Sequence, residues 1–246
     1  MAGWFGQSRQ VKPEAVARQI ADALGTNLVS VAFFGHAEAH PAPGVEPNLL
    51  IIAKDASAGL LRPIAGAVAE WAKAKGTAPL IFAETEWHAS ADVFPIEIED
   101  MRGAHTLLAG RDPFAGLQTT RADLRRQLER EVRGKLLRLR AEYAAAAPSG
   151  KALERLLAGS AGTFLVLFRA ALRLAGRTPP GDPAGLVAET SAVAGFDAVA
   201  LDWVLLRLGS RRVPALTAFD PVAGRYLQAA ERLAAYVDGI EIEGGA

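Results

Sequence analysis

The stretch that decides the fold is residues 28–53, which read LVSVAFFGHAEAHPAPGVEPNLLIIA. Its first seven residues are rich in β-branched and aromatic side chains and stop at Gly35, which predicts a strand over 28–34. A proline-rich loop follows, and the apolar run over 49–53 predicts a second strand. Strand, loop and strand therefore form the centre of a small sheet.

The sequence on either side adds helices and strands to this centre. Val16, Ile20 and Leu24 recur every four residues, which predicts an amphipathic helix over 13–24. A second helical pattern covers 58–75 and ends at Gly76. Short apolar runs predict further strands over 79–83, 94–98 and 106–109.

The pattern changes to long helices from Thr120 onward. Thr120 with Asp123 is typical of a helix start, and an apolar stripe at helical spacing runs on to Tyr143. Further helices are expected over 151–175, 183–193, 196–208 and 220–237. The expected fold class is thus α+β, with a small mixed-sheet domain over 1–118 and an all-helical bundle over 119–246.

Composition excludes several classes of function. The chain has no cysteine, which removes disulfides and thiolate metal sites, and its 27 basic and 27 acidic side chains balance. The start of the chain, residues 1–9, lacks the pattern of a secretory signal, so we expect a cytoplasmic location. The apolar stretch 156–175 contains Arg169 and Arg173, which indicates a buried core helix and not a membrane span.

The segments Val31–His36 and Glu46–Ile52 resemble the core of the nucleotidyltransferase superfamily. That family has an apolar strand, a Gly-Ser turn, a variable loop, and an Asp-x-Asp motif that leads into a second strand. The helical half is similar to the C-terminal bundle of its kanamycin-type and minimal members. The resemblance implies Mg²⁺ with a nucleoside triphosphate as the ligands, because carboxylates hold the metal ions that bridge the phosphates.

At key positions the chain departs from the family pattern. The resemblance places Glu46 at the first carboxylate, as a catalytic and metal-binding residue. Asn48 stands at the second, where its neutral carbonyl is a poor ligand for a hard divalent cation. Gly35 and His36 stand at the Gly-Ser turn, so Gly35, His36 and Asn48 are expected to contact a nucleotide. The alternative is that Glu46 is a solvated loop residue and Asn48 a turn residue.

Glu97 is expected to be the third carboxylate, catalytic and metal-binding. In the strand predicted over 94–98, alternation would put Glu97 and Glu99 on one face and Ile96 and Ile98 on the other. Glu97 lies nearer the strand centre and is therefore preferred. The alternative is that both acids line the solvated face of an edge strand.

The helix over 121–143 carries an excess of basic side chains. Arg126, Arg130 and Arg133 share one face, and Arg126 and Arg130 are candidates to contact a triphosphate. The alternative is a solvated face whose charges pair along the helix, as Glu129–Arg133 and Glu131–Lys135. No aromatic residues lie between these arginines, which disfavours nucleic acid as a partner.

Arg169 and Arg173 need partners if they are buried, and acids of the following helices are expected to supply them. The candidates are Asp197, Asp202 and Glu189.

Three functions remain open on the sequence. The leading hypothesis is a nucleotidyltransferase-like protein, impaired or inactive in catalysis, that binds a nucleotide, another small molecule or a protein partner. The second is an active metal-dependent nucleotidyltransferase acting on a small molecule or protein, with Glu46, Glu97 and either Asp55 or Glu99 as ligands. The third is a non-enzymatic, antitoxin-like helical module that pairs with a second copy or a helical partner.

Overall fold

A computed structural model describes residues 11–35 and 47–241 of the chain, and it confirms the predicted α+β fold class. The chain divides into two compact units. The α/β unit comprises described residues 11–35, 47–91 and 101–118, and the helical unit comprises 92–100 and 119–241.

The α/β unit is built on a four-stranded mixed sheet in the order β3-β2-β1-β4. Its strands are β1 (Leu28–Phe34), β2 (Asn48–Ala53), β3 (Leu80–Ala83) and β4 (His105–Gly110), which confirms four of the predicted strands. β1 runs antiparallel to β2 and β4, whereas β2 and β3 are parallel. Every residue of β2 is buried, as a continuous apolar run in a central strand requires.

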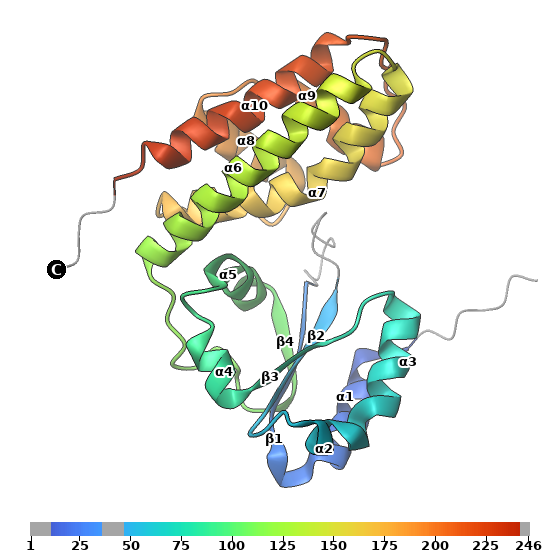
Figure 1. Ribbon diagram of the computed structural model, residues 1–246, viewed down its shortest axis with the longest axis vertical. Coiled ribbons are helices and arrows are strands. Elements are labelled where there is room, and N and C mark those ends of the chain that lie inside the picture. Colours follow the sequence, from blue (N-terminus) through green and yellow to red (C-terminus); the bar gives the residue numbers. More distant parts are fainter. Residues whose placement is uncertain (1–10, 36–46, 242–246) are drawn as a thin grey trace, which may run out of the picture. The chain divides into compact units, whose positions relative to one another are not determined.

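Helices cover this sheet on both faces (Figure 1). On one face, α1 (Pro13–Leu24) and α3 (Ala65–Lys75) bury Ile20 and Trp71 against Val31 and Ile51 of the central strands. The predicted helix over 58–75 is interrupted, because Pro63 breaks it into α2 (Ala58–Leu61), a 3₁₀ turn (Arg62–Ile64) and α3. A second 3₁₀ turn, Gly25–Asn27, leads into β1, and α4 (Glu84–Ala89) follows β3.

The helical unit has a continuous apolar core formed by long helices. Thr120 Oγ1 accepts a hydrogen bond from the Asp123 amide at 3.0 Å, which confirms the predicted helix start. Ser149, Asp182 and Asp220 cap later helices in the same way. The helices are α6 (Arg121–Ala146), α7 (Gly150–Leu174), α8 (Pro183–Ala194), α9 (Val199–Leu208) and α10 (Pro221–Asp238).

Among the described residues, α7 alone is long and apolar enough to cross a membrane. Most of its apolar window is nevertheless buried inside the protein, against α6, α8 and α9. Phe164, Leu165 and Phe168 belong to the core of the helical unit. This packing is that of a core helix, as the arginines of the stretch predicted.

The strand predicted over 94–98 is wrong, because this segment begins helix α5 (Pro95–Gly103). Five alternating residues fit a helix as well as a strand, and the longer pattern decides between them. Ile98 and Met101 are both buried and three residues apart, as on one helical face. Pro95 in the first turn with Glu97 close behind is typical of a helix N-terminus.

Candidate functional site

The predicted nucleotide-binding edge of the α/β unit is described in part. β1 ends at Phe34, which pairs with Asn48 at the start of β2, so Gly35 and Asn48 lie at the same edge of the sheet. Gly35 adopts a φ of 78°, a conformation that glycine accepts without strain, and its amide donates to the Ala104 carbonyl at 3.0 Å. The predicted site residues His36 and Glu46 lie outside the described residues.

Asn48 is held by hydrogen bonds on every side. Its side chain is buried, with the residue only 8% exposed, and Nδ2 donates to the Ala78 carbonyl at 2.8 Å. Oδ1 accepts from Trp71 Nε1 at 2.8 Å and from the Leu49 amide at 2.8 Å. An amide oxygen has two lone pairs, and both are used here. Asn48 therefore ties the start of β2 to α3 and to the segment before β3.

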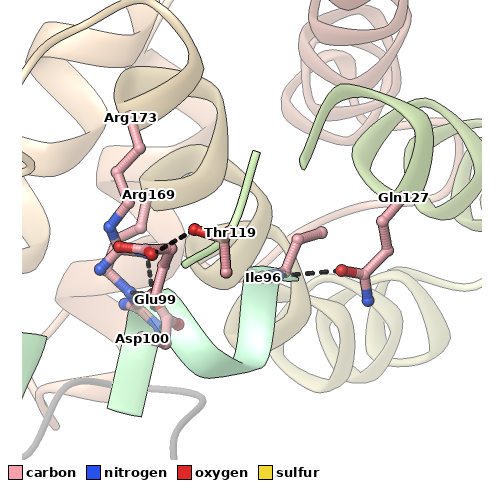
Figure 2. Close-up of polar contacts among 7 residues, drawn as sticks. All are labelled: Ile96, Glu99, Asp100, Thr119, Gln127, Arg169 and Arg173. Atoms are coloured by element: carbon pink, nitrogen blue, oxygen red, sulfur yellow. Dashed lines mark hydrogen bonds and ion pairs between the residues drawn. The ribbon is translucent and has the colours of Figure 1, made fainter. Parts of the chain in front are cut away.

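Glu97 lies on α5 and not on a strand, so the expected alternation of Glu97 and Glu99 against Ile96 and Ile98 does not occur. Gln127 of α6 caps this helix, because its Oε1 accepts from the Ile96 amide at 2.9 Å. The same side chain donates from Nε2 to Glu97 Oε2 at 2.8 Å. The first turn of α5 is thereby fixed to α6 within the helical unit (Figure 2).

Arg126 and Arg130, the arginines predicted to contact a nucleotide, are both exposed on α6. Arg126 pairs with Asp123 one turn earlier. The neighbouring Arg133 pairs with Glu129, as predicted, at 3.3 Å and with Asp238 at 2.9 Å. Within the described part of the chain, Arg130 has no carboxylate partner. Of this basic face, Arg130 is the side chain best placed to meet an anion.

Sequence reasoning missed a largely buried ionic cluster in the helical unit. Arg169 and Arg173 of α7 both reach Asp100 of α5, as Figure 2 shows, and not the predicted Asp197, Asp202 or Glu189. Arg169 grips the carboxylate with two nitrogens, Nε at 3.1 Å from Oδ1 and Nη2 at 2.8 Å from Oδ2. The side chain of Asp100 is 9% exposed, so the pair is shielded from water.

The neighbouring Glu99 adds a contact, since its Oε1 accepts from Thr119 Oγ1 at 2.5 Å. Pairing between distant helices is invisible to local patterns. The sequence held one signal: two arginines in an apolar helix need acidic partners.

Two residues of the magnesium site that the resemblance implies have other partners, and the third, Glu46, lies outside the described residues. Asn48 has no free lone pair for a metal, and Glu97 is bound to Gln127 on another element. Across residues 11–35 and 47–241, no group of three or more His, Asp or Glu side chains is arranged to hold a metal ion. No model of a known protein family matches the chain, and a search of curated proteins finds no match either.

Proposed function

We propose that the chain is a nucleotidyltransferase-like protein, impaired or inactive in catalysis, that acts by binding a nucleotide. The observation that carries this proposal is the hydrogen bonding of Asn48. Asn48 stands at the position where the family has its second metal-binding carboxylate. Its side chain is neutral, and both oxygen lone pairs and an amide hydrogen form hydrogen bonds inside the protein. A metal ion could reach that oxygen only by displacing Trp71 or the Leu49 amide.

One feature of the α/β unit supports a retained binding role. The turn after β1 still has a glycine with positive φ beside the first residue of β2, where no Cβ hinders the approach of a phosphate. In the helical unit, Arg130 is an exposed cation on α6 and a separate candidate for contact with an anion. We further propose a cytoplasmic location, which agrees with the absence of cysteine and with the burial of α7.

The decisive experiment titrates nucleoside triphosphates with and without Mg²⁺. Binding is read by thermal shift, and catalysis by transfer of labelled nucleotide. We expect binding that does not need the metal, weakened in His36→Ala and Arg130→Ala, and no transfer. Arg232→Ala, an exposed arginine of α10, is the matched control and should bind as the unaltered protein does.

The other two functions give different results. Magnesium-dependent transfer that is lost in Glu46→Gln would identify an active enzyme and contradict the proposal. No response to any nucleotide, together with a stable dimer by size-exclusion chromatography, would leave the helical interaction module. Each result requires a different partner, namely a free nucleotide, an acceptor substrate or a second copy of the chain.

A further inference from the structure

An open groove of about 350 Å³ runs between α6 and α7 within the helical unit. Its volume falls in the range of small-molecule sites, roughly 300–1,000 Å³. Cationic side chains line it from both helices: Lys135 and Arg138 from α6, and Arg155 from α7. The only carboxylate in the lining is that of Glu142.

The positive charge of the groove is not neutralised internally. Glu142 is taken by Arg138, whose Nε lies 2.6 Å from Oε1 one turn away. The pair predicted between Glu131 and Lys135 does not form. Within the part of the chain that the structure describes, neither Lys135 nor Arg155 has a carboxylate within 4.0 Å. The groove therefore keeps two cations, one from each wall, for which the described residues supply no counter-ion.

Apolar side chains form the floor of the groove. Leu139, Leu156 and Phe164 line it, and Leu139 and Phe164 also belong to the core. The hydroxyl of Ser160 faces inward: its Oγ lies 2.9 Å from the Leu156 carbonyl and 3.0 Å from Tyr226 Oη. Burial raises the pKa of the Tyr226 phenol, although its contact with Ser160 opposes the shift. Tyr226 therefore stays neutral.

On the rim, Thr163 is exposed and its hydroxyl makes no hydrogen bond to another described residue. Its hydroxyl is thus available to a ligand as a donor.

We propose that this groove binds a small amphipathic organic anion. The apolar part of such a ligand would lie on Leu139, Leu156 and Phe164, and its phosphate, sulfonate or carboxylate would lie between Lys135 and Arg155. Charge-assisted contacts from two cations explain the preference for an anion, and the floor explains why an organic one is favoured over an inorganic one. The proposal uses no residue of the nucleotide site proposed above and does not depend on it.

The first test measures binding of 8-anilinonaphthalene-1-sulfonate to the full chain by its fluorescence. We expect saturable binding at one site, weaker at high salt because the charges of the rim are screened. Lys135→Gln combined with Arg155→Gln should weaken binding by at least about tenfold, as the loss of charge-assisted contacts implies. Lys73→Gln combined with Arg232→Gln, two exposed cations outside the groove, is the matched control and should change nothing.

The second test fills the groove without removing charge. A Cβ on Gly159, which lines the groove, meets no atom within 4 Å, so the side chain of Gly159→Leu can extend into open space. We expect this variant to lose binding while its Tm is unchanged or higher, since leucine favours a helix more than glycine does. Gly66→Leu on α3 is the control. A Cβ on Gly66 also meets no atom within 4 Å, so this variant should likewise gain helix propensity, but it should still bind the sulfonate.

Two results would overturn the proposal. One is the absence of saturable binding of the sulfonate by the unaltered chain. The other is equal binding by the unaltered chain, the charge variant and Gly159→Leu, which would place the probe elsewhere on the surface. If inorganic pyrophosphate competes as well as the organic anion, the two cations alone account for binding. That result would contradict the proposed role of the apolar floor.

Discussion

Asn48 in the α/β unit and Asp100 in the helical unit are both shielded from water, yet opposite chemistry satisfies them. Asn48 is neutral and meets two N–H donors and a carbonyl acceptor. Asp100 is charged and meets the guanidinium groups of Arg169 and Arg173. Asn48 is neutral where the sequence resemblance led us to expect a carboxylate, and the charged Asp100 lies where that resemblance gave no expectation.

The difference matters because the two arrangements respond differently to the loss of one member. A neutral hydrogen bond contributes about 1 kcal/mol to the free energy of unfolding. A buried ion pair adds little net stability, but removing one partner leaves an uncompensated charge and costs about 3–5 kcal/mol. Substitutions in the two regions should therefore differ in how much they lower the free energy of unfolding.

The largest effect is expected from Asp100→Ala. This change leaves two arginines without their carboxylate partner, and their side chains are only 11% and 17% exposed. It should lower the free energy of unfolding by about 3–5 kcal/mol. Chemical denaturation followed by far-UV circular dichroism measures this. Asp100→Asn keeps the shape of the side chain and an acceptor oxygen. Its free energy of unfolding should therefore lie between those of the unaltered protein and Asp100→Ala.

Asp197→Ala is the matched control for Asp100→Ala. Asp197 forms an exposed pair with Arg225 at 3.6 Å, and its loss should cost less than about 1 kcal/mol. Equal losses in Asp100→Ala and Asp197→Ala would mean that burial does not distinguish the ionic cluster from a surface pair.

The second effect in size is expected from Asn48→Asp, which introduces the carboxylate found in the family that the sequence resembles. The new carboxylate can still accept from Trp71 and Leu49, but it cannot donate to the Ala78 carbonyl. We expect a loss of about 1–3 kcal/mol at neutral pH. Added Mg²⁺ should not recover it, whereas a magnesium-dependent rise in Tm would point to a latent metal site.

The pH dependence of Asn48→Asp has a definite sign. Burial and the facing Ala78 carbonyl favour the protonated acid, whereas the Trp71 and Leu49 N–H donors favour the carboxylate. We expect the first two to prevail, so that the pKa in the folded state lies above the unfolded value of about 3.9. The penalty is therefore full above the folded pKa and shrinks as the pH falls through it. A difference between variant and unaltered protein that grows on acidification would contradict this account.

The sequence predicted the α/β centre well because its signals are local. The runs over 28–34 and 49–53 are apolar, long enough for strands and bounded by turn residues, and β1 and β2 form there. The segment 94–98 failed because alternation over five residues is ambiguous. The spacing of Ile98 and Met101 favours the helix, and Gln127, 31 positions away, caps its first turn at the Ile96 amide.

The polar partners could not be predicted for a related reason. Arg169 and Asp100 are 69 residues apart, and only tertiary packing selects Asp100 over the nearer acids of α8 and α9. Trp71 lies in the helix predicted over 58–75, and Asn48 lies one residue before the strand predicted over 49–53, although β2 begins with it. Nothing in a periodic pattern says that an indole N–H will meet an amide oxygen. Sequence patterns fix the faces of elements, and packing then chooses the contacts.

The smallest effect is expected at the edge of the ionic region, from Thr119→Val. This nearly isosteric change removes the hydroxyl that donates to Glu99, and Thr119 is partly exposed, so water can take its place. We expect a loss of about 1 kcal/mol or less by the same denaturation measurement. Thr163→Val, whose hydroxyl bonds no other described residue, should change the free energy of unfolding by under about 0.5 kcal/mol. If Thr119→Val lowered the free energy of unfolding as much as Asp100→Ala does, the stabilising cluster would extend to Glu99. One neutral donor would then matter as much as the charged partners of Asp100.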